Sequence, residues 1–368
     1  MAGVVNDGGA GVTIGRTNEY AFITLCYNCQ QMTVVVTGAA GHAGANLVRA
    51  LLAQGHPTRA LVHVDRKPIE GMDVEVIEGD IRNLESLTRA FEGADVVYHL
   101  AAHISILKDE WPLLESVNVI GTRNVVEACL RCGVRRLVHF STIHTMTQAL
   151  TDIPVSEAHP LVKSRHYPPY DRSKAAAERE VRQGIEKGLN AIIISPTAII
   201  GPYDYKPSHF GEALLRLANG RLPALVSGGF DWVDVRDVVQ GAMRAEERAP
   251  AGAKYILSGH WASLREVAVL VEQIAGVPAP RFVCPMWLAR IGAPFITAFD
   301  RLAGRRPLYT GVSLQTLRDN RKISHQKATG ELAYHPRPLQ KTLVDTLRWF
   351  EEAGQLAYPL RLGKAGPP

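Results

Sequence analysis

A glycine-rich turn between a strand and a helix constrains the fold of this chain more than any other feature. The segment Thr33–Thr37 is rich in β-branched residues, and Gly38, Gly41 and Gly44 follow it, before an apolar helical pattern that begins near Ala45. In such a turn the glycines let backbone N–H groups approach a pyrophosphate and let the helix pack closely on the strand, and the helix N-terminus adds partial positive charge. The segment therefore predicts a dinucleotide-binding turn, with a purely structural glycine-rich turn as the alternative.

Strand-like and helix-like segments continue to alternate after this turn, with long helical patterns at 118–132 and 170–187. Strands separated by helices of this length are typical of parallel βαβ units. We therefore expect an α/β fold with a Rossmann-type, doubly wound parallel sheet, to which Trp232–Val239 and Lys254–Leu257 return. The other strands are expected at Thr58–Val64, Asp73–Glu78, Asp95–Leu100, Arg136–Ser141 and Asn190–Ser195.

We expect the folded unit to begin at Met32, because the residues before it are glycine-rich at the start and lack helical periodicity. They also lack the basic segment and long apolar core of a secretory signal, so a disordered extension is expected there. The predicted organisation is an extension (1–31), a Rossmann domain (32–198, with return segments at about 230–258), a smaller, mostly helical substrate lobe (199–229 and 259–356) and a tail (357–368).

The composition of the chain limits the kinds of ligand and partner that it is expected to bind. The net charge is only +5 over 368 residues and the basic residues are dispersed, which mildly favours an anionic ligand and gives no indication of nucleic acid. The five cysteines lack the spacing of a secreted scaffold, which indicates free thiols and a cytoplasmic location. A zinc site built from the pairs Cys26/Cys29 and Cys129/Cys132 is an alternative, but one pair lies on a predicted helix among apolar neighbours. We expect no metal site.

The most apolar window of the chain is Phe282–Phe299, which Pro285, Arg290 and Pro294 interrupt. It barely reaches the length of a membrane span. A helix that lines or caps an apolar substrate pocket is the favoured interpretation, and contact with a membrane interface is the alternative.

Two further segments carry chemistry. Tyr170 and Lys174 are four residues apart at the start of a predicted helix, so both side chains lie on one face. A phenol has an ordinary pKa of about 10, and a nearby ammonium lowers it toward the range of an acid/base catalyst. Thr142 follows the fifth strand, at the sheet edge where ligands bind, and its hydroxyl can donate a hydrogen bond to a substrate carbonyl.

Taken together, these motifs resemble the extended short-chain dehydrogenase/reductases, over about residues 32–356. The motifs are Thr37–Gly44, Gly79-Asp80, His99–Ala102, Asn118–Thr122, Ser141-Thr142, Tyr170–Lys174 and Gly201-Pro202. The resemblance implies a catalytic set of Thr142, Tyr170 and Lys174, with threonine in place of the usual serine. Asn118 has an equally good structural explanation, as a residue that bends or caps a helix. The implied cofactor-binding residues are Gly38, Ala40, Gly41, His42, Ala43, Gly44, His63, Asp65, Arg66, Asp80, Ile81, Leu100, Ala101, Ala102, Tyr170, Lys174, Pro196 and Thr197.

Within that family the chain is most similar to the branch of dihydroflavonol reductases and 3β-hydroxysteroid dehydrogenases. Nucleotide-sugar enzymes of the family tend to place an arginine where, by alignment of the segment, Phe230 stands. The resemblance therefore implies an NAD(P)-dependent oxidoreductase acting on an apolar secondary alcohol or ketone. A nucleotide-sugar epimerase or dehydratase with retained NAD, and a cofactor-sensing regulator without catalysis, are the alternatives.

Cofactor choice depends on the end of the second strand, where a carboxylate favours NAD and basic residues favour the 2′-phosphate of NADP. His63, Asp65, Arg66 and Lys67 stand there, and their basic majority slightly favours NADP(H). His103, His144 and Phe230 are candidate substrate contacts, and for each histidine a pocket-wall or surface residue is favoured over a proton relay. A homodimer is expected only by analogy with the fold.

Overall fold

The computed structural model describes residues 32–107, 109–148, 153–302, 307–317 and 322–361. The fold described below is that of the compact unit 33–368. The predicted extension over 1–31, with Cys26 and Cys29, lies outside the described residues, as does most of the predicted tail.

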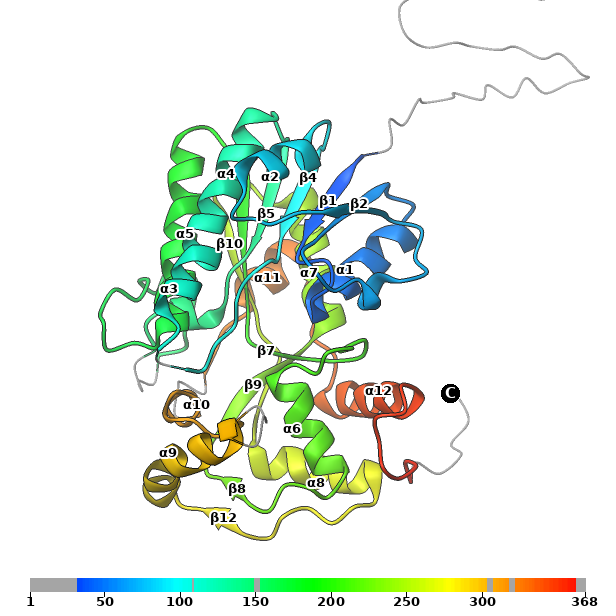
Figure 1. Cartoon of the computed structure of the whole chain (residues 1–368), viewed down its shortest axis with the longest axis vertical. Helices are drawn as coiled ribbons and strands as arrows, with labels where there is room; N and C mark the ends of the chain where they lie inside the picture. Colours follow the sequence, from blue (N-terminus) through cyan, green and yellow to red (C-terminus); the bar gives the residue numbers. More distant parts are fainter. Residues whose placement is uncertain (1–31, 108, 149–152, 303–306, 318–321, 362–368) are drawn as a thin grey trace, which may run out of the picture. The chain divides into compact units, whose positions relative to one another are not determined.

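Seven parallel strands form the main sheet, in the order β10-β6-β5-β4-β1-β2-β3 (Figure 1). The direction in which successive strands are added reverses beside β1, and ligands of such sheets bind at the carboxyl ends of the strands near this reversal. The prediction of a Rossmann-type sheet is confirmed. Each of the seven strands begins and ends within two residues of the predicted bounds, whereas the 232–239 segment, also predicted in this sheet, lies elsewhere. The strands are β1 (Val34–Thr37), β2 (Thr58–Val62), β3 (Glu75–Glu78), β4 (Val96–His99), β5 (Arg136–Phe140), β6 (Ala191–Pro196) and β10 (Lys254–Leu257).

Helices cover both faces of this sheet (Figure 1). On one face, alternate strand residues such as Val35, Leu137 and Ile193 pack with apolar residues of α2, α4 and α5. Burial on both faces explains the nearly continuous runs of valine and isoleucine in the strands. The helices of that face are α2 (Leu84–Phe91), α4 (Gly121–Arg131) and α5 (Pro169–Glu186), and those of the other are α1 (His42–Ala53), α7 (Val235–Arg248) and α11 (Gln326–Leu332).

The helical backbone predicted over 118–132 begins earlier, at Trp111, and consists of three consecutive segments that end with α4. Helix α4 is preceded by α3 (Trp111–Leu114) and by η2 (Glu115–Ile120), a π-helical segment that runs directly into α4. Such segments inside a helix are frequent at functional sites, because they shift the side chains that follow. Asn118 lies in this segment.

A smaller, mostly helical lobe follows, as predicted. Its core includes Trp232, Leu343, Leu347 and Phe350. One helix of the same stretch of sequence, α11, packs instead on α7 and β10 of the Rossmann part. The lobe contains α6 (His209–Ala218), α8 (Leu264–Ala275), α9 (Met286–Leu302), α10 (Gly311–Thr316) and α12 (Leu339–Glu352), with β7 (Ala198–Ile200), β8 (Leu225–Val226), β9 (Gly229–Asp234), β11 (His260–Ser263) and β12 (Val283–Cys284).

The prediction that 232–239 returns to the main sheet is wrong. Strand β9 lies between β7 and β11 in a separate three-stranded sheet, and the chain turns into α7 at Val235. Asp234 caps this helix, because its carboxylate accepts a hydrogen bond from the backbone N–H of Arg236 at 2.8 Å. The cap outweighs the strand preference of the valines that follow.

Candidate active site

The glycine-rich turn leaves no room for a side chain at Gly38 or Gly44. Gly38 has a φ of 72°, and a Cβ there would lie 2.6 Å from the backbone nitrogen of Ala101. A Cβ on Gly44 would lie 2.1 Å from the carbonyl oxygen of Gly38. The turn leads directly into α1 at His42, so the backbone at the helix N-terminus is open to a bound anion.

A cavity of about 920 Å³ lies at the carboxyl ends of the strands, with walls from the main sheet and from the smaller lobe. It brings together residues from distant segments, including almost every predicted site residue. Those that line it are Gly38, Ala40, Gly41, His42, Ala43, Gly44, His63, Asp65, Asp80, Ile81, Leu100, Ala101, Ala102, His103, Thr142, His144, Tyr170, Lys174, Pro196, Thr197 and Phe230.

Arg66 is the exception among the predicted cofactor-binding residues, and its role stays a prediction. It does not line the cavity, and its guanidinium forms an ion pair with Glu78 of the neighbouring strand β3. The chain turns sharply here, since the carboxylate of Asp65 accepts a hydrogen bond from the backbone N–H of Lys67 at 3.0 Å. Arg82 lines the cavity instead and pairs with Asp80. This hydrogen bond lowers the pKa of Asp80.

Helix α5 presents Tyr170 and Lys174 one turn apart, as the spacing predicts. Nζ of Lys174 donates a hydrogen bond to the carbonyl oxygen of Phe140 at 2.7 Å. Burial lowers the pKa of Lys174 to about 8, against the opposing effect of Glu178. Burial and the charge of Asp171 raise the pKa of Tyr170, which is the opposite of the predicted direction. The protein alone therefore stabilises a protonated phenol.

Thr142 is buried at the end of β5 and lines the same cavity. Its Oγ1 accepts a hydrogen bond from the backbone N–H of His144 at 3.4 Å. Because the oxygen acts as the acceptor in that contact, the hydroxyl proton is available to a ligand.

An ion pair that sequence reasoning missed lies behind Thr142. The buried carboxylate of Glu178 accepts hydrogen bonds from Nζ of Lys254 at 2.9 and 3.0 Å and from the hydroxyl of Ser141 at 3.0 Å. The hydroxyl of Thr145 also donates to it, at 3.3 Å. Burial raises the pKa of Glu178, but the charges of Lys254 and Arg182 outweigh this and lower it. Its position could have been noticed from the sequence, because Glu178 follows Lys174 by four residues and so lies on the same face of the predicted helix.

Asn118 connects three parts of the site. Its amide group accepts from the backbone N–H of His103 at 2.7 Å and donates to the carbonyl oxygen of His103 at 3.0 Å. It also donates to the hydroxyl of Ser173 at 2.9 Å. The π-helical segment thus ties the loop after β4 to α5.

The part of the cavity in the smaller lobe is apolar. Phe210, Phe230 and Trp232 meet edge to face, with ring centroids 4.9 to 5.4 Å apart. Phe210 comes from α6, and Phe230 and Trp232 come from β9. Because the two elements are separate in the sequence, the cluster could not be predicted, and only Phe230 was identified. Other apolar residues of this wall are Leu217, Leu222, Leu225, Leu264, Leu308, Tyr309, Val312 and Leu317. None of the described residues of α9 lines the cavity, so this helix does not form part of its wall; that it caps the pocket stays a prediction.

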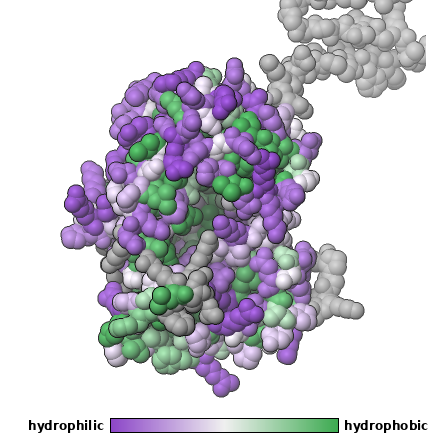
Figure 2. Space-filling view, in the orientation of Figure 1, coloured by the Kyte–Doolittle hydropathy of each residue, from purple (hydrophilic) through white to green (hydrophobic). Residues whose placement is uncertain are grey.

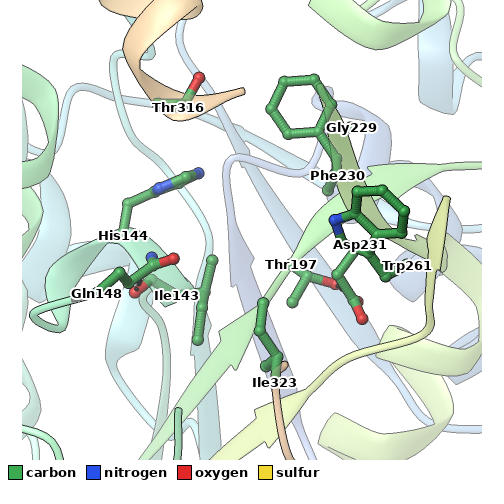
Figure 3. A pocket seen from close by; sticks show the side chains of 11 residues that line it. Ile143, His144, Gln148, Thr197, Gly229, Phe230, Asp231, Trp261, Thr316 and Ile323 are labelled. Carbon is green, nitrogen blue, oxygen red and sulfur yellow. Dashed lines mark hydrogen bonds between the residues drawn. The ribbon is translucent and has the colours of Figure 1, made fainter. Parts of the chain in front are cut away.

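Figure 3 shows a second cavity of about 30 Å³, whose wall includes His144, Thr197, Phe230 and Thr316. These four residues and Ala198 also line the large cavity. The volume of the second cavity is enough for one water molecule. The hydroxyl of Thr197 donates to the buried carboxylate of Asp231 at 2.7 Å. His144 lines both cavities, and it stays a candidate substrate contact.

Residues 34–257 match the NAD dependent epimerase/dehydratase family. The chain belongs to this family. It is 34% identical to the sterol demethylase protein B of Methylococcus capsulatus, over 88% of this chain and 100% of that protein. It is also 30% identical to a 4-hydroxy-2-methyl-3-oxo-4-farnesyl-3,4-dihydroquinoline-1-oxide ketoreductase of Stigmatella aurantiaca, over 90% of this chain and 100% of the relative. The resemblance to the extended short-chain dehydrogenase/reductases is confirmed.

Solved structures agree with this assignment. The crystal structure of gox2253 superposes with a TM-score of 0.78 at 33% identity, over 89% of this chain and 100% of gox2253. The UDP-glucose 4-epimerase of Thermotoga maritima has a TM-score of 0.73 at 20% identity, over 88% of this chain and 99% of the epimerase, which shows the shared fold.

As a member of this family, the protein is an oxidoreductase that binds a nicotinamide cofactor. The glycine turn at the start of α1, where a Cβ at Gly38 or Gly44 would collide with backbone, fits the pyrophosphate of such a cofactor. Among the described residues, no three His, Cys, Asp or Glu side chains are grouped as a metal site requires.

Proposed function

We propose that this protein interconverts a secondary alcohol and a ketone on a fairly apolar small molecule of steroid, flavonoid or terpenoid type. The observation that carries the proposal is the aromatic wall of Phe210, Phe230 and Trp232, which lines the same cavity as Tyr170 and Lys174. An uncharged polycyclic or isoprenoid substrate fits such a wall, whereas the diphosphate of a nucleotide sugar finds no arginine at Phe230. The names of the two relatives, which refer to a sterol and to a farnesylated ketone, support this substrate class.

In the proposed reaction, the nicotinamide cofactor accepts or supplies the hydride when it is bound. The phenol of Tyr170 gives a proton to the substrate oxygen when a ketone is reduced, and takes it back when an alcohol is oxidised. The hydroxyl of Thr142 donates a hydrogen bond to the same oxygen and stabilises its developing negative charge. The ammonium of Lys174 favours the phenolate that remains on Tyr170.

The protein's preference is proposed to be NADP(H) over NAD(H), by a modest factor. His63 and Arg82 line the cavity where it meets the end of β2, and Arg82 already neutralises Asp80. Asp65 lines the same wall and opposes a 2′-phosphate, while Arg66 is engaged with Glu78. We therefore expect kcat/KM for NADPH to exceed that for NADH by less than about tenfold, because the carboxylate of Asp65 repels the 2′-phosphate that Arg82 attracts.

The test is turnover of apolar ketones with NADPH and NADH by wild type and Tyr170→Phe. The variant should lose at least ~100-fold in kcat while cofactor affinity barely changes, because only the proton donor is removed. Unchanged turnover would remove Tyr170 from the mechanism.

Mass spectrometry of nucleotide released on denaturation distinguishes the proposed oxidoreductase from an epimerase or dehydratase. Near-stoichiometric NAD would favour an epimerase or dehydratase that recycles its cofactor, a reading that the family match supports. Cofactor binding without turnover of any carbonyl substrate would favour a regulator.

A further inference from the structure

Helix α9 is apolar on two opposite sides. On its inner side, Ala293 is buried against Val226, Leu314 and Leu317, and Met286 packs on the same cluster. A helix that is apolar all round normally lies in a protein core or in a membrane. In the part of the chain that the structure describes, no residue covers the outer side of α9 in this way.

The exposed side forms a continuous apolar surface. Trp287, Ile291 and Phe295 recur every four residues and are 65%, 60% and 74% exposed. Figure 2 shows apolar atoms gathered at the lower left, over this helix. We call the surface the α9 patch; its members are Phe282, Trp287, Leu288, Ile291, Phe295 and Ile296, each at least 40% exposed. Exposed apolar surface of this extent usually marks an interaction site.

The charged residues next to or between the members of the α9 patch in the sequence are both arginines. Between Glu272 and Asp300 the only charged residues are Arg281 and Arg290. Both are exposed, and neither forms an ion pair with a described residue. Near its C-terminal end α9 also contains Asp300, followed by Arg301. Tryptophan, phenylalanine and leucine flanked by arginine are typical of helices that lie in the interface of an anionic bilayer.

The patch is one helix away from the cavity. Helix α10 packs on α9, and its residues Val312, Ser313 and Thr316 line the cavity on the other side. Helix α10 therefore contacts both the helix that carries the patch and the cavity.

We propose that the α9 patch docks this protein on the surface of a membrane that contains anionic lipids. The helix lies in the headgroup region and does not cross the bilayer; among the described helices, none is long and apolar enough to do so. Only the further step, uptake of an apolar substrate from the bilayer, rests on the proposed function.

The experiment is flotation of the full chain with vesicles of phosphatidylcholine and phosphatidylglycerol, and with vesicles of phosphatidylcholine alone. Binding should favour the anionic vesicles and weaken as salt is added. The double variant Ile291→Ser/Phe295→Ser should reduce the bound fraction at least ~10-fold. The matched control Val76→Ser/Val269→Ser removes exposed apolar residues from β3 and α8 and should bind as wild type does.

A second pair of variants keeps the test decisive if the first is unstable. Arg281→Glu/Arg290→Glu should abolish the preference for anionic vesicles, and Arg89→Glu/Arg348→Glu, at exposed sites elsewhere, should not. Absence of wild-type binding, or equal binding by patch and control variants, would overturn the proposal. A wild-type dimer that Ile291→Ser/Phe295→Ser makes monomeric, without vesicle binding, would assign the patch to a second copy. Flotation is scored without turnover, so failure of the proposed reaction leaves its outcome unaffected.

Discussion

The carboxylate of Glu178 and the ammonium of Lys254 form a buried ion pair, with Nζ to oxygen distances of 2.9 and 3.0 Å. The pair joins α5 to β10 of the main sheet. Because the same carboxylate holds the hydroxyls of Ser141 and Thr145, it also fixes both sides of the segment that carries Thr142. The site therefore depends on a charge pair that does not line the cavity.

Glu178→Gln tests this dependence. Removing one charge leaves Lys254 buried and uncompensated, so the free energy of unfolding should fall by about 3 kcal/mol. Urea denaturation measures it. Glu127→Gln breaks the exposed pair with Arg131 and should cost no more than about 0.5 kcal/mol. Similar losses in both variants would contradict a special role for Glu178.

The same pair sets an acid limit on stability. The pKa of Glu178 is lowered in the folded protein, so its stabilising contribution is complete above the ordinary carboxyl pKa of about 4.5 and is lost as pH falls through the folded value. We expect wild type to lose more stability than Glu178→Gln between pH 5 and 3, as estimated from the ordinary pKa of about 4.5. Parallel stability profiles of the two proteins would contradict this.

Lys174 should trade stability for activity. Its pKa of about 8 lies below the ordinary 10.5, so below about pH 8 the protein holds a buried charge at a cost in stability that fades as pH rises toward 10.5. Lys174→Met should therefore raise the free energy of unfolding at pH 7 by about 1–2 kcal/mol, after allowing for the hydrogen bond lost at Phe140, and should lose turnover. Thermal unfolding and kcat measure the two effects, and a less stable variant would contradict the burial argument.

The hydroxyl of residue 142, more than its size, should matter for turnover. Thr142→Ser keeps the donor and should stay within about tenfold of wild-type kcat, whereas Thr142→Val has nearly the same shape and should lose ~10²- to 10³-fold. Steady-state kinetics with one ketone and saturating cofactor make the comparison. Equal activity of Thr142→Val and wild type would remove the hydroxyl from the mechanism.

Phe230 should control use of apolar substrates. Phe230→Ala opens the aromatic wall and should lower kcat/KM for a bulky ketone by about 10- to 200-fold, with cofactor affinity unchanged. The exposed Val269→Ala serves as the control. An unchanged kcat/KM would place the substrate elsewhere in the cavity.

Structural features that depend only on residues close together in the sequence could be predicted from it. The glycine turn, the buried strands and the spacing of Tyr170 and Lys174 depend on local backbone geometry and on periodicity, and these act over a few residues. The return of Lys254–Leu257 to the sheet followed from the same strand pattern. The 232–239 segment was misassigned because Asp234, as a helix cap, competes with strand propensity there.

Features that depend on contact between distant residues needed the tertiary structure. Pairing of β2 with β3 takes Arg66 to Glu78, and the sheet brings Lys254 to Glu178, although 76 positions separate them. The aromatic wall gathers side chains from α6 and β9, and the pKa of Tyr170 rises because the folded chain buries it. Sequence alone thus determined the fold class, the glycine-rich turn and the spacing of Tyr170 and Lys174 on one helix, since each is encoded over a short stretch. Only the tertiary structure decided which charges pair, which faces stay exposed and how the site titrates, because burial and long-range contact exist only once the chain has folded.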